Sequence, residues 1–242
     1  SGESYFERCR RVPADSGEGH PGACEGGEGK PTELVGEEGS KQPGEASEEA
    51  KRDAETVRAE RKWKSVDSPT DWGNRYYGNW ATSATEEERA AVMFYKNDSI
   101  PINTPLRERG YIRNAQHEQY SENLSRLIKR AKTPHDMIVF RGAAAQFYED
   151  VQEGQIFRDD GFVSTSISKD GAETFTDPFG EGRKTVRITI LVPKGTRAGY
   201  FAQIDDEDLS DELVLAKGTR FKVMRRRNNQ IVMKVLPRKV QK

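Results

Sequence analysis

The hydrophobic pattern of this chain changes once, close to Thr133-Pro134, and that change limits the folds the chain can adopt. Before this point apolar residues recur at helical spacing, most clearly over residues 82–97 and 116–131. After it they form short alternating or continuous runs of strand length, at residues 137–140, 162–167, 185–192, 212–215, 220–224 and 231–235. Helices followed by strands are typical of an α+β domain, so we predict that fold class.

The segment at 82–97 carries the clearest helix signals. Thr85 is the expected N-cap, and Glu88 three residues later completes a capping box. Trp72, Tyr77 and Trp80 lie just before it at helical spacing, and we expect these large aromatic side chains to pack in a core.

Residues 1–50 differ from the rest of the chain. They are rich in Gly, Glu, Pro and Ser and show no helical or strand period, and the whole chain is only 33% hydrophobic and 33% charged. We therefore expect a disordered acidic arm over residues 1–50 and one folded domain over residues 51–242. Residues 48–64 have helical propensity but few apolar positions, which predicts a solvated helix leading into that domain.

Charge and cysteine content restrict the classes of partner. Lys plus Arg total 39 and Asp plus Glu total 40, so a net charge of -1 gives no global attraction to nucleic acid or anionic lipid. No apolar run approaches the roughly 18 to 20 residues that span a bilayer, and we expect a soluble fragment or mature piece with no membrane partner. Cys9 and Cys24 could form one disulfide or remain free thiols, and with His20 they make too irregular a set to predict a zinc site. We expect no metal.

Three separated elements carry residues suited to binding a dinucleotide. Arg141 ends an apolar run and is followed by Gly142, so its planar guanidinium could hold a pyrophosphate where backbone approaches a ligand closely. In Ser164-Thr165-Ser166, strand alternation places the two serines on one face and the threonine on the other. Glu212 opens an apolar strand, where a carboxylate is costly unless it is paired or used. Taken singly, the arginine is also explained by a surface ion pair and the serines by an edge strand.

Together with their flanking residues, these elements resemble the R-S-E class of mono-ADP-ribosyltransferases, and most closely the iota-type, actin-modifying binary toxins. The resemblance covers residues 63–237. The matching motifs are Trp72-Gly73, Tyr77, Trp80, Thr85-x-x-Glu88, Tyr95, Ile102-Asn103, Leu106-Arg107, Phe140-Arg141-Gly142, Phe162-Val163-Ser164-Thr165-Ser166, Val192-Pro193-Lys194-Gly195, Ala198-Gly199-Tyr200, and Glu212 with Gly218-Thr219-Arg220-Phe221-Lys222-Val223.

The resemblance implies that residues 51–242 are a catalytic domain with two perpendicular β-sheets, antiparallel or mixed, and an N-terminal helical lobe. It implies NAD as substrate, no metal, and a host protein as acceptor of ADP-ribose, actin-like by resemblance. Arg141 and Gly142 would lie at the NAD phosphates, and Ser164, with Thr165 and Ser166 beside it, would position the catalytic carboxylate. Glu212 would hydrogen-bond the ribose next to nicotinamide and stabilise the positive charge of an oxocarbenium-like transition state.

One position departs from the family pattern. Arginine-modifying members carry a glutamate two residues before the catalytic one, and Rho-type members carry a glutamine, whereas this chain has Ser210. Serine cannot act as a carboxylate base, although Asp208 or Asp211 could come near in the same loop. An acidic residue such as Glu207 replaces the aromatic residue that the family has there. NAD cleavage is therefore better supported than any particular acceptor.

Two alternatives remain beside a transferase that acts as a toxin, bacterial effector or phage-encoded modifier, delivered by secretion, injection or a virion into host cytoplasm. The first is an NAD glycohydrolase, in which water replaces the acceptor. The second is a non-catalytic phage structural or binding module that keeps the fold. We expect the basic hairpin tip at residues 225–229 to be solvated, and nucleic acid is not an expected partner.

Overall fold

The computed structural model describes residues 47–173, 184–205 and 211–237. Most of the predicted arm lies outside these ranges, so the division into an arm and one domain stays a prediction. None of the helices within the described ranges is long and apolar enough to cross a membrane. Individual predicted residues that lie outside the described ranges are Cys9, Cys24, His20, Glu207, Asp208 and Ser210.

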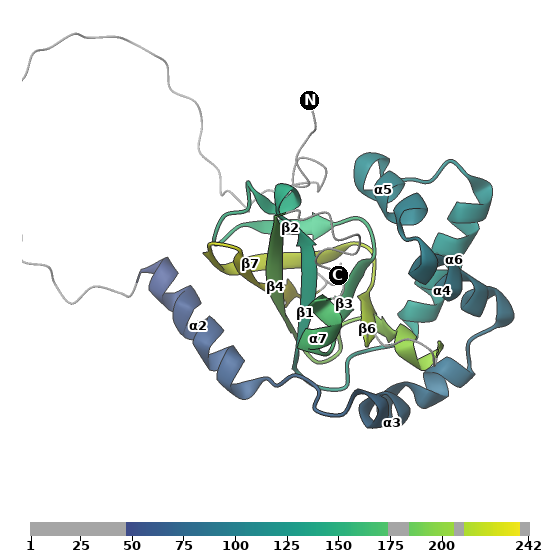
Figure 1. Ribbon diagram of the computed structural model, residues 1–242, viewed down its shortest axis with the longest axis horizontal. Helices are drawn as coiled ribbons and strands as arrows, with labels where there is room; N and C mark the ends of the chain where they lie inside the picture. Colours follow the sequence, from purple (N-terminus) through teal and green to yellow (C-terminus); the bar gives the residue numbers. More distant parts are fainter. Residues whose placement is uncertain (1–46, 174–183, 206–210, 238–242) are drawn as a thin grey trace, which may run out of the picture.

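Helices make up the first part of the described chain (Figure 1). The two helices predicted at 82–97 and 116–131 are confirmed as α4 and α6. The α-helices are α2 (Glu48–Lys62), α3 (Pro69–Thr82), α4 (Glu86–Asn97), α5 (Ile100–Arg109), α6 (Ala115–Lys129) and, among the strands, the short α7 (Lys169–Glu173); the 3-10 helices are η1 (Ala145–Tyr148) and η2 (Phe201–Gln203).

The strands form one mixed sheet. The strands are β1 (Met137–Ala144), β2 (Ile156–Asp159), β3 (Val163–Ser166), β4 (Thr185–Val192), β5 (Ala198–Tyr200), β6 (Glu212–Leu215), β7 (Thr219–Arg227) and β8 (Gln230–Leu236). Their order across the sheet is β2-β7-β8-β4-β1-β3-β6-β5, and every neighbouring pair is antiparallel except β4 and β8, which are parallel. An α+β fold with an N-terminal helical part is therefore confirmed.

The sheet differs from the expected pair of perpendicular sheets in one respect. Strands β1 and β3 share a single residue pair, Phe140 with Ser166, and this pair joins β3, β6 and β5 to the other five strands. By contrast, β1 and β4 pair along their whole length. The hydrogen-bonded sheet is thus continuous, but one narrow junction divides it into two parts.

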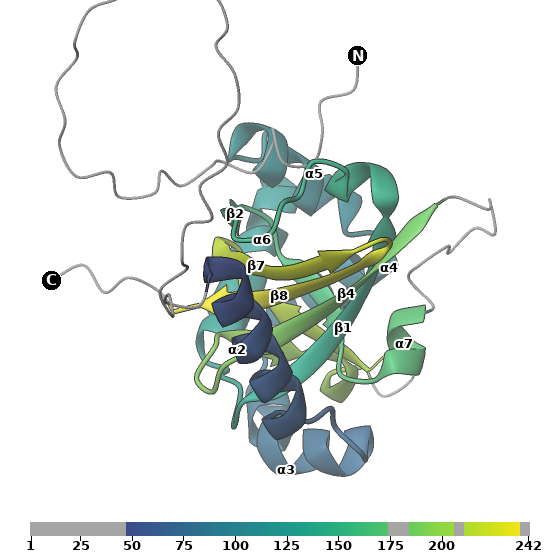
Figure 2. The same ribbon diagram turned by 90° about the vertical axis from the view of Figure 1, so that its left-hand side faces the viewer.

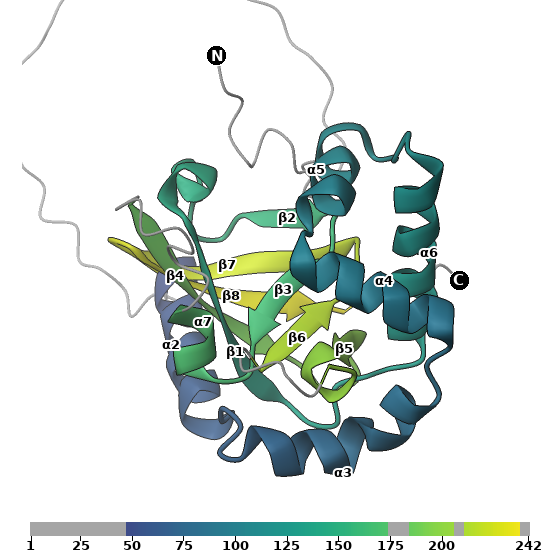
Figure 3. The same ribbon diagram turned by 45° about the vertical axis from the view of Figure 1, so that its right-hand side comes forward.

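Helices lie on both sides of this sheet. Helix α2 crosses in front of β7, β8 and β4 in Figure 2, whereas α4, α5 and α6 lie on the opposite side, beside β3 and β6 (Figure 3). The main core lies between these later helices and the sheet, and the predicted aromatic side chains Trp72, Tyr77 and Trp80 are buried in it.

Helix α2 is mostly exposed, as its composition predicted, but one face of it packs on the sheet. Its acidic side chains face basic side chains of the sheet: Glu60 pairs with Arg225 at 2.8 Å, and Glu55 pairs with Lys234. Ala59 and Trp63 pack on a small second cluster of apolar side chains, formed by Ile138, Leu191, Met224 and Val232. The docking was not predicted, because charged residues that look solvated in the sequence have partners on β7 and β8.

Two short strands were not predicted. Strand β2 pairs with β7, and the ring of Phe157 stacks on that of Phe221 with 5.4 Å between the ring centroids. Strand β5 is only three residues long and pairs with β6. Such short strands take their stability from tertiary packing, so local sequence patterns are weak evidence for them.

An ion pair between a buried carboxylate and an exposed arginine links α4 to the end of α6. The capping box is as predicted, with Thr85 and Glu88 exchanging hydrogen bonds of 3.3 and 3.1 Å. The Glu88 carboxylate, 1% exposed, also accepts two bonds from the Arg130 guanidinium, at 2.8 and 2.7 Å. These bonds from Arg130 outweigh burial and lower the pKa of Glu88.

We expect Glu88→Gln to lower the free energy of unfolding by about 1–3 kcal/mol near neutral pH, because the buried carboxylate loses its charge-assisted hydrogen bonds from Arg130. The folded-state pKa of Glu88 is lowered, so its stabilisation is present above the ordinary glutamate pKa and is lost as the pH falls through the lowered one. Urea denaturation across this pH range checks both points. Glu86→Gln, at an exposed position of the same turn, is the control, and a difference from wild type that persists in acid would contradict the prediction.

Candidate functional site

The three predicted site elements meet at the junction of the sheet. Ser166 of β3 pairs with Phe140 of β1 on one side and with Glu212 of β6 on the other. Directly paired residues in a sheet point to the same face, and so do residues two apart along a strand. Ser164, Ser166 and Glu212 therefore share one face, as predicted for the two serines.

Arg141 lies within β1 rather than at its end. The strand continues for three residues beyond it, because the small residues that follow keep pairing with β4. Since β1 and β3 pair only at Phe140 and Ser166, the two strands separate beyond that point. The Arg141 guanidinium spans the gap, and its Nη1 donates a hydrogen bond of 2.7 Å to the carbonyl oxygen of Ser164.

A tyrosine of helix α4 holds the Ser164 hydroxyl. Its Oγ lies 3.0 Å from the hydroxyl of Tyr95 in α4, and that hydroxyl accepts a 3.0 Å hydrogen bond from the Asn103 amide in α5. Burial, together with the negative charge of Glu212, raises the pKa of Tyr95 to about 12. Tyr95 therefore keeps its proton at neutral pH and stays able to donate a hydrogen bond.

A second set of contacts fixes the turn that leads into β3. Arg107 of α5 makes a bidentate ion pair with Asp159, at 2.9 and 3.2 Å, and donates to the carbonyl oxygen of Phe162 at 3.0 Å. Asp159 in turn accepts from the backbone N–H of Gly161, and the Asn103 oxygen accepts from that of Phe162. We call the side chains of Asn103, Arg107 and Asp159 the loop clamp.

The rest of the predicted binding strand divides between the two faces. Thr165 points away from the serines and donates to the carbonyl oxygen of Leu213, which ties β3 to β6. The Ser166 hydroxyl accepts from the backbone N–H of Ser168. Glu212 is 5% exposed, so its side chain is almost fully buried.

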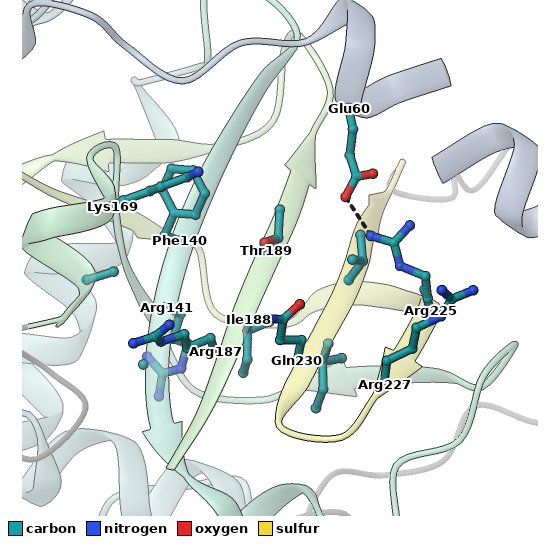
Figure 4. Close-up of a pocket in the computed structure, with 14 residues that line it drawn as sticks. Glu60, Phe140, Arg141, Lys169, Arg187, Ile188, Thr189, Arg225, Arg227 and Gln230 are labelled. Atoms are coloured by element: carbon teal, nitrogen blue, oxygen red, sulfur yellow. Dashed lines mark hydrogen bonds and ion pairs between the residues drawn. The ribbon is translucent and has the colours of Figure 1, made fainter. Parts of the chain in front are cut away.

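A cavity of about 490 Å³ opens on the side of the sheet that faces α2 and α7 (Figure 4). Arg141 and Gly142 line one end of it. Ser164 and Glu212 are not among the described residues that line it. Of the predicted set, Arg141 therefore lies between this cavity and the two residues on β3 and β6.

A model of the ADP-ribosyltransferase exoenzyme family matches residues 69–239, well over half of the chain. The chain belongs to this family. The match begins at the first residue of α3, so it includes the junction, the clamp and Glu212 but not α2.

Two curated relatives agree with this assignment. The chain is 30% identical over 150 residues to the NAD(+)-arginine ADP-ribosyltransferase EFV of Enterococcus faecalis, covering 60% of this chain and 30% of that protein. It is 27% identical over 106 residues to the mono-ADP-ribosyltransferase C3 of Clostridium botulinum C phage, covering 43% of each. The chain thus matches less than half the length of either relative.

A solved structure supports the fold. The C3 exoenzyme of Clostridium limosum superposes with a TM-score of 0.60 at 19% sequence identity, covering 72% of this chain and 96% of that one.

Sequence reasoning assigned no role to Tyr95, Asn103 and Arg107, although it quoted all three as family motifs. Their spacing along α4 and α5 was the available signal. Their partners Ser164, Asp159 and Phe162 lie more than 50 positions away in the sequence, which no local pattern reveals.

The loop clamp leaves no room for a side chain at Gly161. A Cβ there would lie 2.9 Å from both the Arg107 Nε and the Asn103 Oδ1. We expect Gly161→Ala to lower the free energy of unfolding by about 1–3 kcal/mol, measured by urea denaturation. Gly78→Ala is the matched control, because a Cβ at that helical position meets nothing within 4 Å and should stabilise the protein slightly. Equal free energies of unfolding for the two variants would show that the clamp side chains move aside without loss of stability.

Proposed function

We propose that this chain is a mono-ADP-ribosyltransferase of the R-S-E class, which cleaves NAD and transfers ADP-ribose to a host protein. The observation that carries the proposal is the meeting of Arg141, Ser164 and Glu212, from three separate strands, at one junction of the sheet. Family membership and the relatives named above support it. Closeness to the iota type stays a prediction, since those relatives are arginine-modifying and C3-type proteins.

Each residue has a role that its surroundings allow. Arg141 would bind the NAD phosphates, and Gly142 beside it would let backbone approach the ligand. Ser164, oriented by Tyr95, would hold the Glu212 carboxylate in place, and Thr165 and Ser166 would keep β3 in register with β6. Glu212 would then hydrogen-bond the ribose next to nicotinamide, at a site with little water.

The reaction follows from this placement. The bond between ribose C1 and the nicotinamide nitrogen breaks, and its electron pair leaves with neutral nicotinamide. Positive charge then develops on the ribose ring, and a fixed carboxylate nearby stabilises that charge by several kcal/mol. The nucleophile of the acceptor attacks C1 and loses its proton. We expect no metal in this reaction, because nicotinamide already leaves as a neutral group without one.

The proposal does not assign the group that accepts ADP-ribose. Ser210 stands where arginine-modifying members have a glutamate, and it lies outside the described residues. Water would replace the acceptor in the alternative function, an NAD glycohydrolase. An actin-like acceptor, delivery by secretion, injection or a virion, and action in host cytoplasm are proposals from the resemblance.

We expect Glu212→Gln to lower the rate of nicotinamide release from NAD by about 100- to 1,000-fold, because the charge that stabilises the transition state is lost. Release is measured on the purified chain, with and without host lysate, and transfer is followed by mass spectrometry of the lysate proteins. Glu122→Gln, at an exposed position of α6, is the control. Rapid release that lysate leaves unchanged would favour the glycohydrolase. A wild type that neither binds NAD nor differs from Glu212→Gln would leave only a binding module.

Tyr95→Phe tests whether Ser164 is positioned from the helical side. We expect kcat for nicotinamide release to fall about tenfold with little change in KM, because the serine loses its orienting hydrogen bond while the phosphate contacts remain. Tyr77→Phe removes a hydroxyl of an equally buried tyrosine that donates to the carbonyl oxygen of Ala198 in β5, and it should leave kcat unchanged. Equal kcat values for the two variants would exclude the positioning role of Tyr95.

A further inference from the structure

Two pockets adjoin on the surface where the turn between β6 and β7 meets the loop between β4 and β5. Their volumes are about 290 and 370 Å³, and Arg197 and Ala216 line both of them. Because they share these residues, the two pockets form one groove, which we call the basic groove. The other cationic residues that line it are Lys129, Lys132, Lys194, Lys217 and Arg220.

No acidic side chain lines the basic groove among the residues that the structure describes. A third pocket adjoins the groove at Lys217 and Gly218, and the acid in that pocket, Asp160, is paired with Arg158. Five cations of the groove share one property: within the described ranges, their side chains have no ion pair or hydrogen bond. They are Lys129, Lys132, Lys194, Arg197 and Arg220.

The arginines of the basic hairpin tip differ from these cations. The sequence predicted a solvated tip, but Arg225 pairs with Glu60 of α2 at 2.8 Å. The Arg226 guanidinium donates to the carbonyl oxygen of Val151, also at 2.8 Å. The prediction was therefore wrong for these two arginines, which hold the hairpin against its neighbours and are not available to a partner.

Backbone hydrogen bonds fix the walls of the basic groove. The Thr133 backbone donates to the carbonyl oxygen of Thr196 and accepts from the N–H of Gly195, both at 2.9 Å. The N–H of Ala216 donates to the carbonyl oxygen of Arg197 at 3.1 Å, which joins the turn after β6 to the same loop. The cations therefore stand on a framework that is already in place, and this limits the free-energy cost of binding a ligand.

The charges of the groove favour a ligand with several separate negative groups. Like charges close together repel one another, and a bound polyanion offsets that repulsion. The lysines and arginines are spread over two adjoining pockets, so they suit carboxylates distributed along an extended chain better than one compact anion.

Nucleic acid fits the groove less well than an acidic peptide does. Single-stranded nucleic acid is held in large part by bases that stack on aromatic side chains. Among the described lining residues of the groove the one aromatic is Phe162, and it is fully buried. The net charge of -1 also gives no long-range attraction to a phosphate backbone.

We propose that the basic groove is a docking surface for an extended acidic segment of a partner protein. The groove lies at the end of β6, whereas Glu212 is the first residue of that strand, so the surface is distinct from the residues proposed to act on NAD. It does not rest on the proposed function, because docking is measured without NAD.

Fluorescence anisotropy of the full chain with a labelled acidic peptide tests this surface. The probe is a fluorescein-labelled peptide that alternates glutamate with serine over about ten residues, roughly 33 Å when extended. We expect the double variant Arg197→Gln, Arg220→Gln to bind the probe about five- to tenfold more weakly than wild type, because two charge pairs with the peptide are lost. The double variant Arg58→Gln, Arg61→Gln is the matched control: it removes two arginines from exposed positions of α2, and its affinity should equal that of wild type.

A second groove variant keeps the test valid if loss of the arginines disturbs folding. Lys132 and Lys194 are exposed, so Lys132→Gln, Lys194→Gln should leave the urea midpoint of unfolding unchanged while it weakens binding of the probe about threefold. A peptide with glutamine in place of glutamate should not bind, and added salt should weaken binding of the glutamate peptide.

The proposal is overturned if the full chain does not bind the glutamate peptide at low salt, which is the result expected if another segment of this chain already occupies the groove. Equal affinity of wild type and the two groove variants also overturns it. So does tighter binding of an oligothymidine of equal charge, since the groove would then be a nucleic-acid site.

Discussion

The single pairing of Phe140 with Ser166 is the constraint on which the arrangement of the site depends. It joins β3, β6 and β5 to the rest of the sheet, and it lets β1 and β3 separate directly beyond it. A longer pairing would close the gap that the Arg141 guanidinium spans to reach the Ser164 carbonyl oxygen. Without any pairing, Glu212 and Arg141 would belong to two layers with no fixed distance between them.

Helices α4 and α5 hold the far side of this junction. Tyr95 fixes the Ser164 hydroxyl, and the clamp of Asn103, Arg107 and Asp159 fixes the turn before β3. These side chains are buried or nearly so, and they form hydrogen bonds with one another and with the backbone. Such bonds offset the free-energy cost of removing polar groups from water. The helical part therefore does more than cover the core: it orients the residues proposed to act on NAD.

The sequence predicted the elements whose pattern is local. The capping box of α4, the strand at Thr185–Val192 and the shared face of Ser164 and Ser166 follow from periodicity and capping chemistry alone. What it did not predict depends on distant partners. Strand β1 continues past Arg141 because β4 pairs with it. Helix α2 docks because Arg225 and Lys234 on the sheet form ion pairs with its acidic side chains. The loop clamp joins residues more than 50 positions apart in the same way.

The central claim is that NAD binds at the junction with its reacting ribose between Ser164 and Glu212. A crystal structure of the chain with NAD, solved for the Glu212→Gln variant so that the ligand stays intact, tests this most directly. We predict the nicotinamide ribose within hydrogen-bond distance of residue 212 and the phosphates on the Arg141 guanidinium. NAD bound with its ribose away from residue 212, or with its phosphates away from the Arg141 guanidinium, would contradict the claim.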